Sequence, residues 1–199
     1  MTDLWELENS IYDNSGGPVC GADEAGRGPL AGPVYAAAVI LPRGLVIPGL
    51  NDSKKLSEKR REELFDIITG NALSFGIARA EVEEIETLNI LNATFLAMNR
   101  AIAMLDPAPV LAIIDGNRNS GIETESVCVV KGDSRCADIA AASILAKVSR
   151  DRFMYEMADL YPQYAFDQHK GYGTKLHYEK IREFGPSPIH RLSFLKKMH

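Results

Sequence analysis

The sequence of 199 residues contains no apolar run close to the roughly 20 residues that cross a bilayer. Residues 1–6 include two acids and lack the basic start and apolar stretch of a signal peptide. The three cysteines, at positions 20, 128 and 136, form no close pair, which argues against a disulfide framework and a zinc ribbon. These features predict a cytoplasmic protein with reduced cysteines and no membrane partner.

An excess of basic residues, typical of proteins that bind nucleic acids, is also missing, since the net charge is −5. The charge is unevenly distributed. Residues 1–130 carry 10 basic and 19 acidic side chains, whereas residues 131–199 carry 12 basic and 8 acidic ones and all four histidines. The C-terminal part is therefore a candidate anion-binding region, although a solvated basic tail has the same composition.

Hydrophobic patterning predicts an α/β domain with one central sheet. Short apolar runs predict strands at 18–23, 33–41, 73–80, 110–114 and 127–130. Apolar residues at helical spacing predict helices at 57–71, 88–105 and 138–159. The four glutamates at 81–86 open the second of these helices or lead into it. The last helix begins with small residues, which allow close approach to the sheet, and the chain from 161 onward predicts a basic helical appendage.

Acidic residues stand at the ends of three predicted strands. Asp23 and Glu24 end the first strand, Asp115 ends the fourth, and Asp133 follows the fifth. Sheets of this class place their sites in such loops, and carboxylates gathered there repel one another unless cations lie between them. Mg²⁺ binds oxygen ligands of this kind, and two ions about 4 Å apart can hydrolyse a phosphodiester. Spacing alone does not establish that the acids converge, because an Asp after a strand is commonly a turn former or helix cap.

Several other segments suit contact with a sugar–phosphate backbone. Two glycines in the turn at 26–28 let a ligand approach the main chain, and paired lysines at 54–55 precede a helix. Ser143 and Lys147 share one helix face, and Tyr172, held between glycines, can stack on a sugar or base. Each feature also has an interpretation without a role in binding. The glycine turn can be purely structural, and the lysines can belong to a solvated surface. The face with Ser143 and Lys147 can point to solvent, and the ring of Tyr172 can be packed in the interior.

Seven segments in their order along the chain resemble the bacterial ribonuclease HII (type 2 ribonuclease H) family. Each is weak alone, but together they are specific and extend over about residues 18–195. The segments are 21–29, 52–56, 114–117, 131–134, 141–147, 169–173 and 190–194.

The resemblance implies a ribonuclease H-like fold, with a mixed central sheet flanked by helices. A catalytic domain over 1–160 would form one compact unit with a C-terminal helical extension over 161–199 that binds substrate. The implied activity is endonucleolytic hydrolysis of the RNA strand in RNA–DNA hybrids, and incision 5′ of single ribonucleotides embedded in duplex DNA. Two Mg²⁺ or Mn²⁺ ions would take part, the products would carry 3′-hydroxyl and 5′-phosphate ends, and we expect a monomer.

The same resemblance assigns four acids to the catalytic metal site, namely Asp23, Glu24, Asp115 and Asp133. Asp138 is a second candidate for the fourth position. It falls in the first turn of a predicted helix, where the dipole favours a carboxylate in any case. Asp133 occupies the Lys-Gly-Asp position of the family and is therefore preferred.

Substrate contacts are implied for seven further residues. The turn formed by Gly26, Arg27 and Gly28 would recognise the ribose 2′-hydroxyl, which distinguishes RNA from DNA. Tyr172 would pack on the following deoxyribose. Phosphate contacts, or support of the site, are expected from Lys54, Ser143 and Lys147.

Two rival functions fit parts of the pattern. A metal-dependent phosphatase for small substrates would not need the paired lysines, the glycine turn or the basic appendage. A non-catalytic module that binds hybrids should have lost at least one of the acids, and none is missing. The nuclease therefore accounts for more of the sequence.

Overall fold

The centre of the molecule is a mixed sheet, which we describe from a computed structural model covering residues 4–51 and 53–196, apart from the side chain of Lys55. The sheet has five strands in the order β3-β2-β1-β4-β5. β1 pairs antiparallel with β2 and parallel with β4. The strands are β1 (Val19–Ala25), β2 (Val34–Ile40), β3 (Ser74–Ala80), β4 (Leu111–Asp115) and β5 (Ser126–Val129). The predicted α/β class is confirmed, and the strand ends differ from the prediction by one or two residues.

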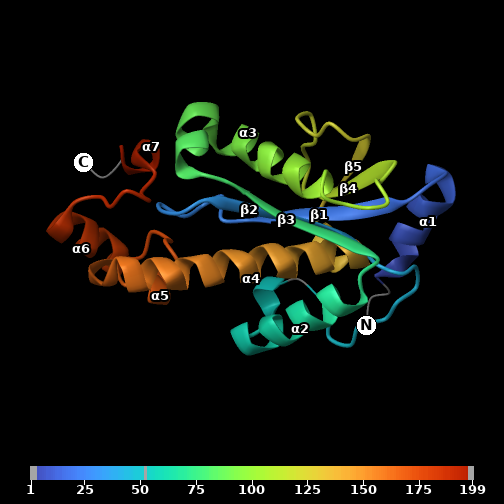
Figure 1. The fold of residues 1–199 in the computed structure, drawn as a ribbon, viewed down its shortest axis with the longest axis horizontal. Helices are drawn as coiled ribbons and strands as arrows, with labels where there is room; N and C mark the ends of the chain where they lie inside the picture. Colours follow the sequence, from blue (N-terminus) through green and yellow to red (C-terminus); the bar gives the residue numbers. More distant parts are fainter. Residues whose placement is uncertain (1–3, 52, 197–199) are drawn as a thin grey trace.

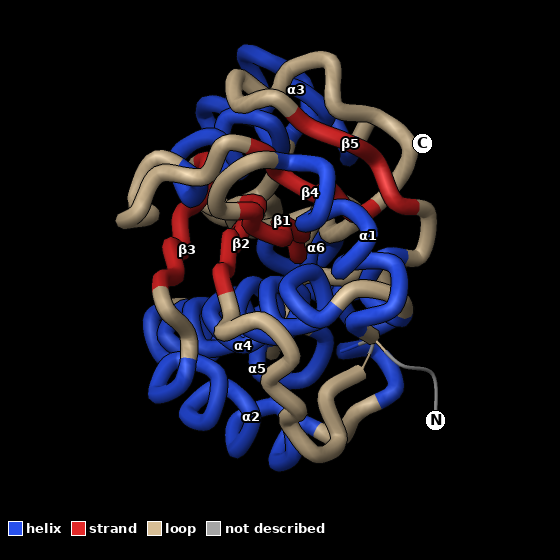
Figure 2. Tube along the Cα trace, turned by 90° about the vertical axis from the view of Figure 1, so that its right-hand side faces the viewer, coloured by secondary structure: helices blue, strands red, loops and turns tan. Residues whose placement is uncertain are grey.

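Helices cover both faces of the sheet. Figure 1 shows α3 on one face and α2 with α4 on the other, and the end-on view in Figure 2 shows the sheet between these layers. The α-helices are α1 (Trp5–Ser15), α2 (Glu58–Asn71), α3 (Val82–Ile102), α4 (Ala137–Leu160), α5 (Phe166–His169), α6 (Lys175–Phe184) and α7 (Leu192–Leu195), and the 3-10 turns are η1 (Ser53–Lys55), η2 (Gly132–Ser134) and η3 (Pro162–Tyr164). None of the helices in the described residues has the length and apolarity needed to cross a membrane.

Strand β2 lies in the middle of this arrangement, and all seven of its residues are buried. Ala37 and Val39 face the core shared with α2 and α4, whereas Ala36 and Ala38 face the core shared with α3. A strand covered on both faces is apolar throughout instead of alternating with polar residues. This explains the unbroken apolar run in the sequence.

Helix α4 packs unusually close to β1 because both elements present small groups. A Cβ atom on Gly21 would lie 2.3 Å from the main-chain carbon of Asp138 and the nitrogen of Ile139. Ala140, Ala141 and Ala142 follow in the helix and are fully buried. The predicted close approach is confirmed, and it brings the side chains of α4 to the end of β1.

Helix α1 was not predicted, because its sequence has few apolar residues and begins without a side-chain cap. Trp5 is buried and donates a hydrogen bond from Nε1 to the carbonyl of Leu45 at 2.8 Å. The helix ends at Gly16, whose φ of 73° is left-handed. Burial of Trp5 against a distant loop, which no local pattern reveals, therefore fixes this helix.

Helix α3 begins within the glutamate-rich segment at 81–86, which the sequence offers as its opening. A capping box between Glu81 and Glu84 starts it before Val82, and Asn89 interrupts it with φ 68° and ψ 164°. The Asn89 side chain then accepts hydrogen bonds from the amides of Leu91 and Asn92. The helix predicted at 88–105 thus corresponds to the second of two helical segments.

The C-terminal extension, described here over 161–196, packs on the end of α4 that is remote from α1 (Figure 1). Tyr164 and Phe166 form a buried cluster with Met154 of α4 and Ala31 of the β1–β2 connection. This apolar contact joins the extension to the edge of the sheet at which β1 ends and the β1–β2 connection begins. The division at residue 160 stays a prediction.

A buried carboxyl pair joins α1 to α4. Asp138 is fully buried, and its Oδ1 accepts from the amide of Leu41 at 3.0 Å. Its Oδ2 accepts from the hydroxyl of Tyr12, and its own amide donates to Glu8. Burial, together with the neighbouring Glu8 carboxylate, raises the pKa of Asp138 well above its ordinary value. The folded protein therefore favours the protonated form of Asp138.

We expect Asp138→Asn to raise the unfolding temperature at pH 8, with a gain that shrinks toward pH 5. The folded wild type retains the proton of Asp138, whereas the unfolded chain releases it above about pH 4, so wild-type stability falls as pH rises. The Asn amide oxygen can still accept from Leu41, its NH2 replaces the O–H of the protonated acid, and the amide does not titrate. The gain at pH 8 should be on the order of 1 kcal/mol. Thermal unfolding monitored by circular dichroism measures it, and a difference independent of pH would contradict the account.

Candidate active site

Two acids at the end of β1 point to opposite faces of the sheet. Successive residues of a strand alternate between faces, so Asp23 faces α4 and Glu24 faces α3. Ser143 of α4 hydrogen-bonds the Asp23 side chain. Glu24 instead lines a cavity together with Phe95 and other residues of α3. The two carboxylates thus straddle the end of the strand.

Parallel pairing brings a third acid to the same edge. Ala22 of β1 is paired with Ile114 of β4, so Asp115 ends its strand beside Asp23. Asp23 is 4% exposed, and its Oδ1 accepts from the amide of Glu24 at 2.7 Å. Its pKa is raised well above the ordinary value, first by burial and then by the charges of Glu24 and Asp115. The three acids therefore form one electrostatic unit.

A tight turn beside Asp115 carries Asp133, the preferred candidate for the fourth acid. The amide of Gly132 donates to Asp115 Oδ1 at 2.7 Å. A Cβ atom on Gly132 would lie 3.3 Å from the same oxygen and 2.5 Å from Ile139, so the position has little room for a side chain. Asp133 follows in η2 and is 6% exposed. The Lys-Gly-Asp segment thus lies against the end of β4, with Asp133 next in sequence to the glycine that binds Asp115.

Cationic side chains face two of the acids. Arg27 Nη1 lies 3.3 Å from Glu24 Oε1, and Lys54 Nζ lies 3.9 Å from Asp133 Oδ2. Burial raises the pKa of Glu24, and the opposing charge of Arg27 offsets part of that rise. The negative charge of the site is therefore only partly neutralised by the protein.

The donor chemistry fits a hard divalent cation, because all four candidate ligands are carboxylates and burial leaves their charges poorly screened. In the part of the chain that is described, however, no group of three or more His, Cys, Asp or Glu side chains is arranged to enclose one ion. Arg27 and Lys54 engage two of the acids, and Gly132 engages a third. The acids are gathered but do not form a closed ligand set.

The two candidates for the fourth acid lie in different surroundings. Asp133 belongs to the turn that binds Asp115, whereas Asp138 is fully buried and hydrogen-bonded to Leu41 and Tyr12. Asp138 therefore has a structural environment in the interior, which the sequence left open.

The glycine turn (residues 26–28) follows directly after β1 and is exposed at its tip. Gly26 has a φ of 99°, and a Cβ atom there would lie 2.1 Å from Arg150 Nε. Tyr172 is 43% exposed, and its ring lies 4.0 Å from the position of a Cβ atom on Gly28. The turn and Tyr172, far apart in sequence, are thus neighbours beside the acids.

The remaining candidate residues are placed unequally. Ser143 is buried beside Asp23, and its hydroxyl lies 2.8 Å from that of Ser53. Lys54 is exposed at the edge of the site, while Asp52 of the same segment lies outside the described residues. Lys147 pairs with Asp151 at 2.6 Å, so its ammonium group is directed along α4. Ser143 and Lys147 therefore share a helix face but only Ser143 contacts the acids.

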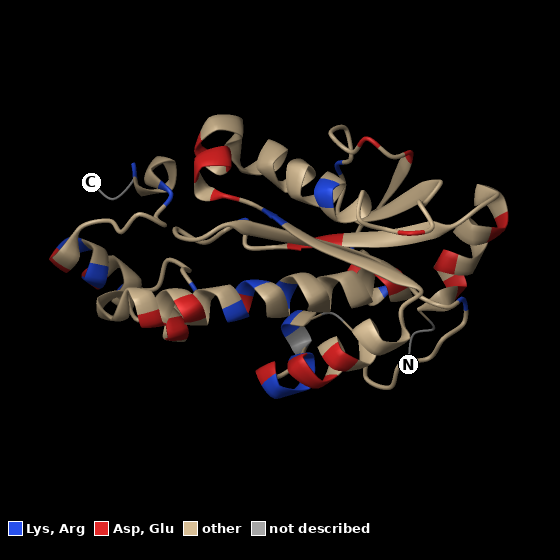
Figure 3. Ribbon diagram, viewed as in Figure 1, with Lys and Arg blue, Asp and Glu red and all other residues tan. Residues whose placement is uncertain are grey.

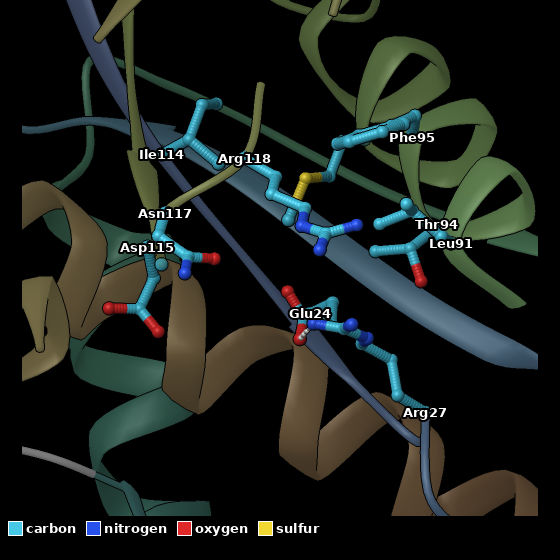
Figure 4. A pocket seen from close by; sticks show the side chains of 11 residues that line it. Glu24, Arg27, Leu91, Thr94, Phe95, Ile114, Asp115, Asn117 and Arg118 are labelled. Carbon is cyan, nitrogen blue, oxygen red and sulfur yellow. Dashed lines mark hydrogen bonds and ion pairs between the residues drawn. The ribbon is translucent and has the colours of Figure 1, made fainter. Parts of the chain in front are cut away.

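Glu24 and Asp115 line a cavity of about 350 Å³. Figure 4 shows both carboxylates among the side chains that surround it. The cavity is lined by the apolar side chains of Leu91, Phe95 and Met98 of α3, and by charged side chains that include Glu24, Asp115 and Arg118. Arg118 was not identified from the sequence as a site residue, because it is an isolated basic residue in a loop. The cavity presents negative and positive groups side by side, as a phosphodiester and its metal ions require.

A sequence model of the family described as Ribonuclease HII matches residues 20–197. The chain belongs to the ribonuclease HII family. Ribonuclease HII of Endomicrobium trichonymphae is 53% identical over 195 residues, which cover 98% of this chain and 93% of that protein. The enzyme is therefore an endonuclease that hydrolyses the RNA strand of RNA–DNA hybrids.

Solved structures agree with the ribonuclease H-like fold. The ribonuclease H2 from Pyrococcus horikoshii OT3 superimposes with a TM-score of 0.72 and 25% identity, over 88% of this chain and 92% of that one. Bst-RNase HIII in complex with Mn²⁺ superimposes with a TM-score of 0.65 and 20% identity, over 84% of this chain and 63% of that one. The mixed sheet and flanking helices predicted for the ribonuclease HII family are thus confirmed.

The basic excess of residues 131–199 is partly internal in this ribonuclease HII. Arg150 and Arg191 are both fully buried. On α6, Lys175 and Lys180 pair with acidic residues of the same helix. Figure 3 shows basic and acidic residues interspersed there. The net charge of this part of the chain therefore overstates the positive surface that it offers to a nucleic acid.

We expect Glu24→Gln to lower the pKa of Asp23 in the metal-free enzyme, because it removes one of the two negative charges that raise it. A titration of the Asp23 carboxyl carbon by NMR measures the change, with the exposed Glu83→Gln as the control. An unchanged Asp23 pKa in Glu24→Gln would show that the two carboxylates do not interact.

Proposed function

We propose that this ribonuclease HII cleaves by two-metal-ion catalysis and also incises 5′ of single ribonucleotides embedded in duplex DNA. The observation that carries the proposal is the gathering of Asp23, Glu24 and Asp115 beside an exposed glycine turn and Tyr172. The carboxylates suit divalent cations, and the turn and the ring suit a ribose and its neighbour. One site then combines hydrolysis with recognition of the sugar.

The metal ions would be held by Asp23, Glu24, Asp115 and Asp133. Divalent-metal dependence is typical of the ribonuclease H family, and the neighbour Bst-RNase HIII was solved with Mn²⁺. We infer Mg²⁺ or Mn²⁺, two ions acting together. When bound, they supply a metal-activated water and stabilise the leaving 3′ oxygen. Arg27 and Lys54 face these acids and would be within reach of phosphate oxygens once cations bound the carboxylates.

Recognition of the sugar would depend on main-chain groups of Gly26, Arg27 and Gly28, which bind the 2′-hydroxyl. The Tyr172 ring, beside Gly28, would pack on the deoxyribose that follows. Lys54 is exposed and would contact phosphate, whereas Ser143 would hold the Asp23 carboxylate in place. For Lys147, which is paired with Asp151, we infer support of the site.

The 2′-hydroxyl is bound for recognition in this scheme and does not attack the phosphorus. Attack by water leaves a 3′-hydroxyl and a 5′-phosphate, whereas attack by the 2′-hydroxyl would leave a 2′,3′-cyclic phosphate. A cyclic product would therefore contradict the proposal.

We also infer a monomer that acts in the cytoplasm. Cys20, Cys128 and Cys136 are free thiols, which suits a reducing compartment. Family membership and the exposed glycine turn favour the nuclease over a small-substrate phosphatase or a non-catalytic hybrid-binding module.

A labelled DNA duplex with one ribonucleotide tests the proposal, beside an all-DNA duplex and an RNA–DNA hybrid. With Mg²⁺ or Mn²⁺ we expect one incision 5′ of the ribonucleotide, absent in EDTA. Asp115→Asn should lower the rate by about 100-fold or more, because it removes a metal ligand. Denaturing electrophoresis with end-group analysis gives both position and product.

Two neighbouring acids supply a matched comparison for the same assay. Asp133→Asn should lose activity as Asp115→Asn does, whereas Asp138→Asn should retain it, since that carboxyl contacts Leu41 and Tyr12 in the interior. If folded Asp138→Asn loses activity while Asp133→Asn keeps it, Asp138 and not Asp133 is the fourth acid of the metal site. Hybrid cleavage without incision at a single ribonucleotide would reject the proposed second substrate.

A further inference from the structure

We propose that the adjacent residues His190 and Arg191 are positioning residues that set the enzyme's selectivity for ribonucleotides. Arg191 holds the glycine turn and His190 holds Tyr172, so that one point of the C-terminal extension fixes both recognition elements. The inference rests on the proposed function, in which the glycine turn and Tyr172 contact the sugars. Neither residue reaches the surface, and neither would touch substrate.

Arg191 clamps the connection that leaves β1. Its guanidinium donates to four main-chain carbonyls, with Nη2 to Gly26 at 2.7 Å and Nη1 to Arg27 at 3.1 Å. It also donates from Nη1 to Pro29 at 2.9 Å and from Nε to Gly32 at 2.8 Å. Its planar fork of donors fits four carbonyls at once, which the single ammonium group of a lysine cannot do.

This clamp determines where the amides of the turn point. In a trans peptide the C=O of one residue and the N–H of the next point in opposite directions. Because Arg191 binds the carbonyls of Gly26 and Arg27, the amides of Arg27 and Gly28 point away from the buried guanidinium. Among the described residues neither amide has a hydrogen-bond partner. The clamp therefore presents two aligned donors on the outer side of the turn.

The main chain around Arg191 strengthens the attachment. The amide of Arg191 donates to the carbonyl of Leu30 at 2.8 Å, and the amide of Gly32 donates to Ile189 at 2.8 Å. Ala31 and His190 form an antiparallel bridge between these bonds. The segment that carries His190 and Arg191 is thus joined directly to the connection after the glycine turn.

His190 begins a second chain of hydrogen bonds, which ends at Tyr172. The amide of Ser187 donates to His190 Nδ1 at 2.8 Å, so the proton of this imidazole resides on Nε2. His190 Nε2 lies 3.0 Å from His177 Nε2, which therefore accepts. His177 then carries its proton on Nδ1 and donates it to the carbonyl of Tyr172 at 3.0 Å. One set of tautomers satisfies every bond.

The surroundings keep these imidazoles neutral, as the chain requires. Burial lowers the pKa of His177 and of His190 to about 4. His169 stacks on His177 at 4.1 Å and accepts from the amide of Gly171, next to Tyr172. These three histidines therefore act as fixed donors and acceptors at neutral pH.

The two branches meet again at the recognition elements. The amide of Leu30 donates to the carbonyl of Gly171 at 2.8 Å. Arg150 donates to Ala31 at 3.1 Å, packs against Gly26 and lies 5.6 Å from the centre of the Tyr172 ring. The turn and the ring thus sit on a shared support, and an error of about 1 Å in such a placement can lower a rate by about 100-fold.

Arg191→Lys tests the first branch, with the exposed Arg182→Lys as the matched control. The readouts are kcat and KM on a duplex with one ribonucleotide, and the inhibition constant of an all-DNA duplex of the same sequence. We expect kcat/KM to fall about 10-fold or more while the inhibition constant stays within about 2-fold. Circular dichroism establishes that the variant is folded. A general loss of structure would weaken both duplexes together.

A pair of substitutions at His190 tests the second branch and keeps the inference testable if Arg191→Lys does not fold. His190→Asn retains an acceptor for Ser187 but cannot reach His177, whereas His190→Gln places an amide N–H where Nε2–H was. Selectivity is the ratio of kcat/KM on the ribonucleotide duplex to the affinity for the all-DNA duplex. We expect this ratio to fall in the Asn variant as it does in Arg191→Lys, and to recover in part in the Gln variant. Equal, wild-type selectivity in both folded variants would overturn the role of His190.

Tyr172→Ala separates this inference from the proposed function on which it rests. If Tyr172→Ala loses selectivity while Arg191→Lys and His190→Asn keep it, the positioning role is wrong and the recognition role stands. If Tyr172→Ala keeps full selectivity, the proposed recognition by Tyr172 fails, and with it the branch through His190. Loss of selectivity in all three variants supports both.

Discussion

The mutual repulsion of carboxylates at the ends of β1 and β4 is the constraint on which the rest of the structure depends. Parallel pairing brings Asp23 and Asp115 together, and alternation along β1 places Glu24 on the other face. Nothing in the packing of the sheet requires three acids there, and their burial raises the free energy of the folded state. The alanine-rich α4 and the apolar face of α3 supply the burial that offsets this cost. A strained cluster on an otherwise consistent fold is typical of a functional site.

The position of the acids at the end of β1 also constrains the turn that follows them. Just after the acids the chain turns through Gly26, which has a left-handed φ and whose lack of a side chain lets Arg150 pack against the main chain. The turn has no regular structure of its own, so its conformation comes from outside, mainly from Arg191 in the C-terminal extension. The extension is therefore part of the site's support, and its buried cations explain why a basic C-terminal sequence exposes less positive charge than its composition indicates.

The sequence predicted the features that local patterns encode. The five strands, α2 and α4 followed from apolar periodicity, and Ser57 caps α2 by accepting a hydrogen bond from the amide of Arg60. Features that depend on distant partners were not predictable. Helix α1 exists because Trp5 packs on a loop at Leu45, and nothing local distinguishes the buried Arg191 from the exposed Arg182. The candidate acids could be named from strand ends, but only the register of β1 and β4 brings them together.

Thermal unfolding of the wild type and Asp115→Asn, with and without Mg²⁺, tests the central claim most directly. If repulsion among the acids destabilises the metal-free fold, Asp115→Asn without metal should unfold at a higher temperature than the wild type. Mg²⁺ should stabilise the wild type by binding the folded state and stabilise the variant far less. A variant that is less stable without metal, and that gains as much from Mg²⁺ as the wild type, would contradict the account.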